Sequence, residues 1–324
     1  MDKISAIRQA VEQELTDYKK LFADALTHED DFLGQALAYV RARQGKLMRP
    51  ILVLLVAKEK GEIKEKTLRS AVTLELLHTA SLVHDDVVDE SGERRGQRSV
   101  NAVFDNKVAV LVGDYLLSAS LLQAALTENV KIVELISKLG GQLSEGEIKQ
   151  LANIRREEIT ETAYFQIIEH KTAALFAACA QLGAISCGAD ADYVKKARRF
   201  GEIVGLCFQI RDDIFDYYED SAIGKPTGND MREGKLTLPA IYAVNHSTRD
   251  DVKAWARKVK AGTASADEVR LLVEYSKTSG GIAYAEKRMA ELHDEAVSLL
   301  KDWKNDNVRQ ALHHYIDYVM ERKL

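Results

Sequence analysis

The scarcity of proline is the feature that most limits what this chain can fold into. Only Pro50, Pro226 and Pro239 occur in 324 residues, whereas ordinary usage would give a chain of this length about sixteen. Proline ends or kinks a helix because its ring clashes with the preceding turn and it lacks an amide hydrogen. Such depletion favours long helices and disfavours turn-rich sandwiches and barrels.

Hydrophobic periodicity supports the same class. Near the N-terminus, Ile4, Ile7 and Val11 recur every three to four residues with charges between them, as on an amphipathic helix. No run of five or six residues alternates strongly enough to predict a strand. The expected helical segments are 51–57, 66–89, 108–126, 163–187, 193–220 and a series after 236, with an interruption or kink at Gly140–Gly141 and a loop at 222–234. We therefore expect one all-α domain over residues 1–324.

Charge and hydropathy limit the partners and the location. Lysine and arginine total 45 and aspartate and glutamate 50, a formal charge of −5, so no basic excess suggests a nucleic-acid partner. The longest unbroken apolar run, 173–180, is far shorter than a membrane span of about 20 residues. The N-terminus shows no apolar signal-peptide core, and the three cysteines form no Cys-x-x-Cys pair. We expect a cytoplasmic protein without a transmembrane segment.

The sequence contains two copies of an Asp-Asp-x-x-Asp motif. The first consists of Asp85, Asp86 and Asp89, and the second of Asp212, Asp213 and Asp216. On a helix, residues four apart share a face, and two carboxylates about 6 Å apart repel by roughly 3 kcal/mol at an effective dielectric constant of 20. A divalent cation would reverse that repulsion, and all-oxygen ligands suit Mg²⁺. Two such motifs in apolar surroundings predict metal ions that hold a diphosphate, rather than an ordinary solvated acidic face.

Basic and amide side chains accompany the acidic motifs. An isolated lysine or arginine is usually only a surface charge, but guanidinium forks and ammonium groups are what phosphate oxygens need. Gln209 lies one helical turn before Asp213, and His78 lies two turns before Asp85; His78 is equally consistent with a histidine of the core. The other candidate phosphate ligands are Lys46, Arg49, Arg94, Arg95, Lys171, Thr172, Lys225 and Lys235.

These motifs resemble those of the trans-isoprenyl diphosphate synthases, or polyprenyl synthetases. The resemblance covers at least residues 44–239 and implies the isoprenoid synthase fold, a single large all-α bundle around a central cavity, usually in a homodimer. Besides the aspartate motifs with His78 and Arg94-Arg95-Gly96, the matching segments are Gly45-Lys46-x-x-Arg49-Pro50, Lys171-Thr172-Ala173, Phe208-Gln209-Ile210, Gly224-Lys225-Pro226-x-Gly228-x-Asp230 and Gly234-Lys235-x-Thr237-Leu238-Pro239.

The resemblance also implies a role for each candidate. Three Mg²⁺ ions would be held by Asp85, Asp89 and Asp212, with Asp86, Asp213 and Asp216 supporting them directly or through water; these six aspartates and Lys171 form the expected catalytic set. The allylic substrate and its diphosphate would lie among Arg94, Lys171, Thr172, Gln209, Lys225 and Lys235. The diphosphate of isopentenyl diphosphate would bind Lys46, Arg49, His78 and Arg95.

The first basic motif departs from the family pattern. The family commonly has Gly-Gly-Lys-Arg-x-Arg-Pro, whereas this chain has Gln44 at the first glycine and Leu47 at the middle arginine. Lys46 and Arg49 keep their places. The motif therefore lacks one positive group, which bears on how tightly isopentenyl diphosphate binds rather than on where it binds.

Small residues before the first aspartate motif indicate a long product. Ser81 lies four residues before Asp85 on the same helix face, Ala80 adjoins it, and Leu77 lies one turn deeper. An aromatic side chain at Ala80 or Ser81 would block a growing chain about 6–8 Å from Asp85. In the family, bulky residues here accompany farnesyl or geranylgeranyl products and small ones longer products. We expect a heptaprenyl to octaprenyl product; the alternative is that the small residues only permit close helix packing.

The expected reaction is the successive 1′-4 condensation of isopentenyl diphosphate with an allylic diphosphate. Metals and cations stabilise the leaving diphosphate, and the alkene attacks the resulting allylic cation, so no nucleophilic side chain is needed. The alternatives are a short-chain farnesyl or geranylgeranyl synthase, a class I terpene cyclase, and a non-catalytic subunit of a two-component synthase. The candidate isopentenyl diphosphate ligands argue against a cyclase, and the presence of both aspartate motifs argues against the subunit.

A long polyprenyl product is nearly insoluble in water. We expect its release to need contact with a membrane or a partner, although no membrane span is predicted. The fate of the product, as a quinone side chain or a lipid carrier, stays open. The terminal pair Arg322–Lys323 is expected to fray rather than to close over the site.

Overall fold

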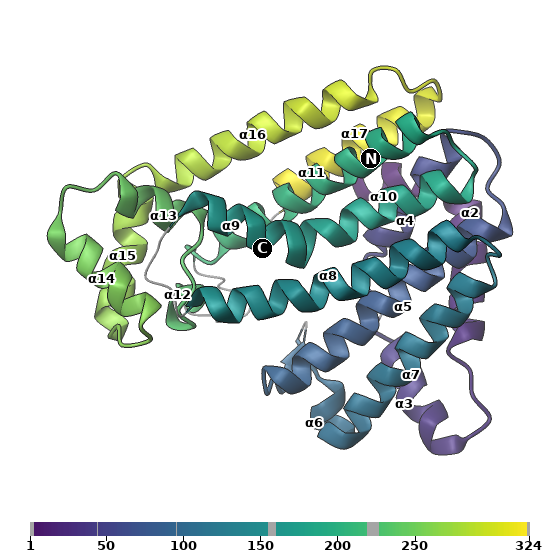
Figure 1. The fold of residues 1–324 in the computed structure, drawn as a ribbon, viewed down its shortest axis with the longest axis horizontal. Coiled ribbons are helices and arrows are strands. Elements are labelled where there is room, and N and C mark those ends of the chain that lie inside the picture. The colour runs from purple at the N-terminus through teal and green to yellow at the C-terminus, as the bar shows by residue number, and fades with distance from the viewer. Residues whose placement is uncertain (1–2, 44, 95, 155–159, 219–226, 323–324) are drawn as a thin grey trace. The chain divides into compact units, whose positions relative to one another are not determined.

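The computed structural model describes residues 3–43, 45–94, 96–154, 160–218 and 227–322. Over these ranges the chain is almost wholly helical, which confirms the all-α prediction (Figure 1). In chain order the elements are α1 (Lys3–Gln9), α2 (Glu12–Ala25), α3 (Asp31–Arg41), α4 (Met48–Lys58), α5 (Glu65–Val88), β1 (Glu93–Arg94), β2 (Gln97–Arg98), α6 (Val100–Phe104), α7 (Asn106–Ala125), α8 (Val130–Ile154), α9 (Glu161–Ile168), the π-helical turn η1 (Glu169–Ala173), α10 (Ala174–Ser186), α11 (Ala191–Phe215), α12 (Asn229–Arg232), α13 (Leu238–Asn245), α14 (Asp250–Lys260), α15 (Ala266–Thr278), α16 (Gly281–Leu300) and α17 (Asp306–Glu321).

Most predicted helices are found with small shifts at their ends. α5 occupies the predicted segment 66–89, and α7 the segment 108–126. α8 continues through Gly140 and Gly141, so the interruption, one of the two predicted alternatives, is wrong. A glycine in a helix costs only about 1 kcal/mol relative to alanine, which burial of the flanking apolar residues exceeds. The antiparallel hairpin of β1 and β2 was not predicted, because strands of two residues are too short to show alternation.

The described helices form two compact units, each assembled from segments far apart in the chain. Unit 1 comprises Met1–Gly140, Leu175–Gly201 and Asp302–Tyr315, and unit 2 comprises Gly141–Ala174, Glu202–Lys301 and Ile316–Leu324. The first aspartate motif belongs to unit 1 and the second to unit 2. Each motif therefore has its own structural surroundings.

Helices α4 and α5 form the centre of unit 1. Residues 51–57 of α4 are completely buried, which explains their unbroken apolar run. α5 packs along α7 (Figure 1) and also contacts α4 and α2. At Gly183 of α10, a Cβ atom would lie 2.5 Å from the carbonyl oxygen of Val53, so a side chain there would separate α10 from α4. The first aspartate motif thus lies at the end of a helix that this core holds in place.

Helix α13 is the centre of unit 2. It contacts α9, α14, α15 and α16, and at Gly281 a Cβ atom would lie 2.3 Å from the carbonyl oxygen of Pro239. The buried Tyr217, two residues after α11, accepts a hydrogen bond from the Ala240 amide at 3.1 Å, and its hydroxyl lies 3.0 Å from the Thr237 hydroxyl. These contacts fix the end of α11, which carries the second aspartate motif, against α13.

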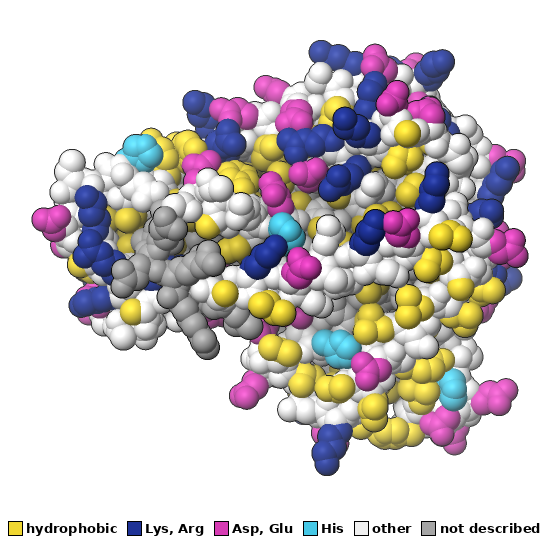
Figure 2. Space-filling model, in the orientation of Figure 1, with side chains coloured by type: hydrophobic (Ala, Val, Ile, Leu, Met, Phe, Trp, Pro, Cys, Tyr) yellow, Lys and Arg dark blue, Asp and Glu magenta, His cyan; other side chains and the backbone are white. Residues whose placement is uncertain are grey.

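Helix α7 has one buried and one exposed apolar side. By length and composition alone it could cross a membrane, yet 39% of it is buried inside the protein, where it packs against α5 as a core helix of unit 1. Figure 2 shows hydrophobic side chains gathered on its outer side. The exposed residues, here called the α7 face, are Val110, Leu111, Leu121, Leu122 and Leu126.

Candidate active site

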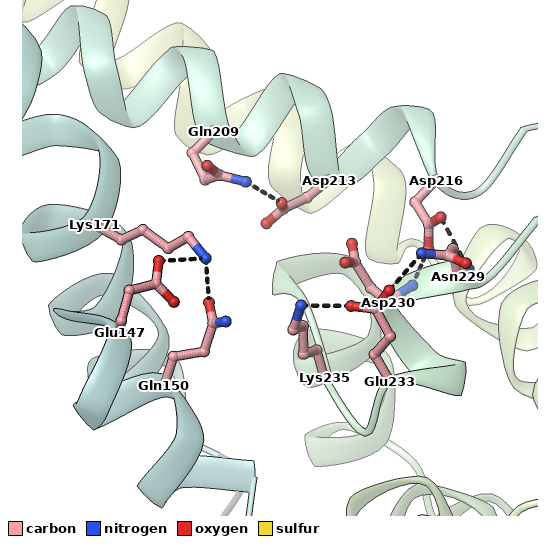
Figure 3. Close-up of polar contacts among 10 residues, drawn as sticks. All are labelled: Glu147, Gln150, Lys171, Gln209, Asp213, Asp216, Asn229, Asp230, Glu233 and Lys235. Carbon is pink, nitrogen blue, oxygen red and sulfur yellow. Dashed lines mark hydrogen bonds and ion pairs between the residues drawn. The ribbon is translucent and has the colours of Figure 1, made fainter. Parts of the chain in front are cut away.

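The second aspartate motif in unit 2 is organised by hydrogen bonds. Asp213 is almost completely buried, and both of its oxygens are occupied. The Tyr164 hydroxyl donates to Asp213 Oδ2 at 2.6 Å. Gln209 Nε2 donates to Asp213 Oδ1 at 2.8 Å, as Figure 3 shows. The Thr172 hydroxyl donates in turn to Gln209 Oε1 at 2.7 Å. The structure thus joins Thr172, Gln209 and Asp213, which were all predicted site residues, and adds Tyr164 to them.

Asp216 organises the loop that follows α11. Its carboxylate accepts hydrogen bonds from the backbone amides of Asn229 at 2.9 Å and Asp230 at 3.1 Å. Gly228, with φ of 76°, makes this turn, and a Cβ there would lie 2.9 Å from Val269 and Val273 methyl carbons. The turn brings the carboxylate of Asp230 to the site, where it lines the cavity with Asp213. Asp230 ends the glycine-rich motif that carries the family resemblance, but it was not among the predicted site residues.

Burial and mutual repulsion raise the pKa values of these carboxyl groups. Burial, followed by the charge of Asp230, raises the pKa of Asp213 to about 8. Burial, followed by the charge of Asp216, raises the pKa of Asp230 to about 6. Burial also raises the pKa of Asp216, against the two amide hydrogen bonds that lower it. The cluster therefore holds negative charge at a cost that a bound cation would relieve.

A cavity of about 160 Å³ lies beside this cluster in unit 2. Lys171 enters it from η1 and Lys235 from the loop after α12, with Asp213 between them (Figure 3). Lys171 Nζ lies 2.8 Å from Glu147 Oε1 and donates to Gln150 Oε1 at 3.2 Å. Lys235 Nζ lies 2.5 Å from Glu233 Oε2. The predicted phosphate ligands that the structure brings together here are Lys171, Thr172, Gln209 and Lys235; Lys225 lies outside the described residues.

Lys260 is a further lysine that lines the same cavity. It ends α14, well beyond the last recognised motif, and burial lowers its pKa. Sequence reasoning missed it, because nothing in the local pattern distinguishes it from the other basic residues in the last turn of this amphipathic helix. Only the packing of α14 in unit 2 places it at the cavity.

Arg322 follows the last helix and binds the second motif. Its guanidinium donates to the Asp212 carboxylate and, at 2.9 Å, to the carbonyl oxygen of Phe208. It also stacks over the Phe208 ring, 3.9 Å from the ring centroid. The prediction that this terminus frays was wrong for Arg322, because a tertiary ion pair and a ring contact hold it; Lys323 lies outside the described residues.

We expect the Arg322→Gln variant to lower the free energy of unfolding by about 1 kcal/mol, because it removes the partly exposed ion pair with Asp212 and the cation–π contact. Urea denaturation would measure the change. Arg322→Lys keeps the charge but loses the flat stacking surface. Its free energy of unfolding should lie between those of Arg322→Gln and the unmodified protein. A glutamine variant as stable as the unmodified protein would contradict the importance of this contact.

The first aspartate motif in unit 1 has one inward and two outward residues. Asp86 is buried and accepts a hydrogen bond from Arg94 Nε at 2.7 Å, whereas Asp85 is half-buried and Asp89 is exposed. Burial raises the pKa of Asp86, and this effect exceeds the lowering by Arg94. Asp86 thus holds Arg94, and the roles of Asp85 and Asp89 as metal ligands stay a prediction. The predicted contact of Arg94 with the allylic diphosphate stays a prediction.

A second cavity, of about 250 Å³, lies within unit 1 beside Asp86. Of the residues predicted to bind isopentenyl diphosphate, His78 lines it together with Arg94. Lys46 is exposed, and the Arg49 guanidinium lies 5.2 Å from the centroid of the Phe176 ring. Arg95 lies outside the described residues. Binding of isopentenyl diphosphate by Lys46, Arg49, His78 and Arg95 stays a prediction.

The predicted chain-length residues are Leu77, Ala80 and Ser81. Leu77 and Ala80 are buried, and Ser81 is half-buried, with its hydroxyl donating to the His78 carbonyl at 2.9 Å. They are not among the described residues that line the unit 1 cavity. The α5 residues that do line it include His78, Leu82 and Asp86. Their role in product length stays a prediction.

Comparison with known proteins identifies the family. The polyprenyl synthetase family model matches residues 30–276. The chain belongs to the polyprenyl synthetase family. It is therefore a trans-prenyltransferase, as its motifs predicted. Octaprenyl diphosphate synthase of Escherichia coli is 31% identical over 95% of this chain and 96% of its own length. Heptaprenyl diphosphate synthase component 2 of Geobacillus stearothermophilus is 33% identical over 99% of both chains.

Solved structures share the fold over nearly the whole chain. A decaprenyl diphosphate synthase from Rhodobacter capsulatus is 34% identical, with a TM-score of 0.91 over 98% of both chains. A geranylgeranyl pyrophosphate synthase from Bacteroides thetaiotaomicron is 48% identical, with a TM-score of 0.87 over 99% of this chain and 100% of that one. These likenesses confirm the isoprenoid synthase fold. The relatives make products of different lengths, so the family alone does not fix the length here.

Proposed function

We propose that this polyprenyl synthetase condenses isopentenyl diphosphate with an allylic diphosphate in successive Mg²⁺-dependent 1′-4 additions. The product would be an all-trans polyprenyl diphosphate of heptaprenyl to octaprenyl length. The observation that carries the proposal is the cavity of unit 2, where Lys171 and Lys235 line the space beside the hydrogen-bonded Asp213. Cations beside clustered carboxylates suit a metal-bound diphosphate.

The donor set fits a divalent metal. Among the described residues, no three or more His, Cys, Asp or Glu side chains are already gathered as a metal site. The oxygens of Asp213, Asp216 and Asp230 are nevertheless hard ligands, and the raised pKa values reflect repulsion and burial that a dication offsets. In unit 2 the ligands would be Asp212, Asp213 and Asp216, joined by Asp230; in unit 1 they would be Asp85, Asp86 and Asp89.

The reaction divides into charge stabilisation and positioning. Bound Mg²⁺ would neutralise the diphosphate as it leaves the allylic carbon. Lys171 and Lys235 would add positive charge to the same phosphate oxygens from two elements of unit 2. Tyr164 and Gln209 hold the Asp213 carboxylate in one orientation, so that no reorganisation is needed during the reaction.

Chain elongation tests the proposal. Purified protein would be incubated with Mg²⁺, farnesyl diphosphate and labelled isopentenyl diphosphate, and the products separated by length. A ladder ending near seven or eight isoprene units would support the reaction and the length. A product ending at geranylgeranyl would support the proposed reaction but contradict the proposed product length. No incorporation, with diphosphate still released from the allylic substrate, would favour a cyclase, and no turnover at all would favour a subunit that needs a partner.

We also propose that the protein is a homodimer joined through the α7 face. Soluble monomers rarely leave several large apolar side chains exposed on one helix, and burial of each leucine is worth about 1.5–3 kcal/mol. The double variant Leu111→Glu/Leu122→Glu should therefore be monomeric at micromolar concentration, as measured by sedimentation velocity. Leu271→Glu, at an exposed leucine of α15, is the matched control and should stay dimeric. A dimer that survives the double variant would place the interface elsewhere.

A cytoplasmic location completes the proposal. Release of a long product would require transient membrane contact, because the polyprenyl chain is nearly insoluble. The product would then serve as a quinone side chain or a lipid carrier. Faster turnover in the presence of phospholipid vesicles, with the protein recovered mainly in the supernatant, would support this arrangement.

A further inference from the structure

Among the described residues, three basic side chains line the unit 1 cavity, and one of them belongs to none of the recognised motifs. His78 comes from α5 and Arg94 from β1, whereas Arg43 follows the C-terminal end of α3. The backbone amide of Arg43 donates to the Val40 carbonyl at 3.1 Å, which continues the last turn of that helix. Arg43 therefore places a guanidinium at this cavity, although it belongs to none of the sequence motifs.

The Arg43 side chain is held in position by an aromatic neighbour. Its guanidinium carbon lies 3.8 Å above the centroid of the Tyr39 ring, and Nη2 donates to the Tyr39 hydroxyl. That hydroxyl donates onward to the carbonyl oxygen of Arg98 at 2.8 Å. The stacked, hydrogen-bonded guanidinium has lost much of its rotamer freedom before any ligand arrives, which lowers the entropic cost of binding one.

Arg43 differs from Arg94 in the charge of its hydrogen-bond partner. Arg94 uses Nε for the buried carboxylate of Asp86, so much of its charge is already balanced. The hydrogen-bond partner of Arg43, the Tyr39 phenol, is neutral. An arginine has five N–H donors, and an anion in the cavity can use those that point away from Tyr39. Arg43, Arg94 and Asp86 line the same cavity.

The basic motif that follows Arg43 lacks one of the positively charged residues that the family commonly has there. Leu47 stands where the family commonly has arginine, and its side chain is buried, with a left-handed backbone at φ of 58°. Neither Leu47, Lys46 nor Arg49 is among the described residues that line the cavity, whereas Arg43 and Gly45 are.

We propose that Arg43 is a substrate-binding residue that contacts the diphosphate of isopentenyl diphosphate in the unit 1 cavity and replaces the positive group lost at Leu47. This assignment rests on the proposed function. Tyr39 is then a positioning residue, which acts by orienting Arg43. The stacked guanidinium offers two parallel N–H groups to phosphate oxygens, a geometry that lysine does not reproduce.

Steady-state kinetics of Arg43→Gln test the proposal. Loss of one charged hydrogen-bonding group should raise the KM for isopentenyl diphosphate by about 10- to 100-fold, while the KM for the allylic substrate changes less than twofold. Arg43→Lys should recover only part of the affinity. Arg41→Gln removes the same charge from an exposed position in the last turn of α3, and this matched control should behave like the unmodified enzyme.

Binding without turnover separates this proposal from the proposed function. Isothermal titration with isopentenyl diphosphate alone should show the same loss of affinity in Arg43→Gln, and Tyr39→Phe should show a smaller loss. If the unmodified protein binds isopentenyl diphosphate but does not elongate farnesyl diphosphate, the proposed function fails while the role of Arg43 is still measured. Equal affinity in Arg43→Gln and Arg41→Gln would overturn the proposal. So would a parallel rise in both KM values with a lowered melting temperature, which indicates a purely structural role.

Discussion

Asp213→Asn is expected to reduce isopentenyl diphosphate incorporation by about 10²- to 10³-fold, the loss typical when one preorganised electrostatic group is removed. Asp213 is the most buried residue of its motif and receives hydrogen bonds from Tyr164 and Gln209. Asparagine fills nearly the same volume, but it is neutral and has one acceptor oxygen instead of two. The variant thus removes the charge that would face Mg²⁺ while leaving the packing of α11 nearly unchanged.

The same variant should be more stable than the unmodified protein when no metal is bound. Burial raises the folded-state pKa of Asp213 to about 8, while an unfolded aspartate has a pKa of about 3.9. The stability that protonated Asp213 contributes is therefore present below about pH 4 and is lost as the pH rises through 8. Asparagine has no such loss. The melting temperature of Asp213→Asn should exceed that of the unmodified protein increasingly between pH 4 and 8.

Magnesium should reverse the order of the melting temperatures of Asp213→Asn and the unmodified protein. Mg²⁺ should raise the melting temperature of the unmodified protein at pH 8, because binding to the folded state stabilises it, and should raise that of Asp213→Asn less. Asp192→Asn changes an exposed aspartate in the first turn of the same helix and is the matched control. Incorporation within tenfold of the unmodified level would contradict the role of Asp213, and a pH-independent stability difference would contradict its raised pKa.

Ser81→Phe is expected to shorten the product from heptaprenyl or octaprenyl to farnesyl or geranylgeranyl length. Ser81 lies one helical turn before Asp85, about 6 Å along the axis, and is half-buried with its hydroxyl on the His78 carbonyl. A phenyl ring there would stand in the path of a chain that grows away from the metal site. Products separated by chain length after elongation with labelled isopentenyl diphosphate would measure the change.

Ala80→Phe should shorten the product too, but with a cost in stability. Ala80 is completely buried, and inserting a large side chain into a packed core typically costs about 1–3 kcal/mol. Ser81→Phe is therefore the sharper test, and Ser81→Ala, which stays small and loses only the hydroxyl, is its control. A product of unchanged length in both phenylalanine variants would show that the small residues serve helix packing alone.

The relatives make this second test informative. Heptaprenyl, octaprenyl and decaprenyl synthases are 31–34% identical to this chain, whereas a geranylgeranyl synthase structure is 48% identical to it. If the unmodified protein already stops at geranylgeranyl, the proposed product length is wrong. The residue that stops chain growth must then lie elsewhere than at Ala80 and Ser81. If it makes a long product, the path beside α5 becomes the natural explanation.

Local sequence signals predicted the helices and both aspartate motifs. A helix repeats every 3.6 residues and a carboxylate pair four residues apart shares one face, so these features can be recognised within one short segment. Predictions that relied on local propensity alone were less accurate. Gly140 and Gly141 suggested an interruption or a kink, and α8 has no interruption there. Arg322 was expected to fray, although Asp212 and Phe208 hold it.

What the sequence by itself determined is the helical class, the family and the pair of acidic motifs, because each depends on residues close together in the chain. Only the tertiary structure decided which groups surround those motifs. Tyr164 reaches Asp213 from 49 residues away, and Arg322 reaches Asp212 from 110 residues away. Arg43 becomes a candidate ligand only because the end of α3 meets α5 and β1 at one cavity. Such contacts depend on how helices pack, since burial and close packing select neighbours by shape and not by their order in the sequence.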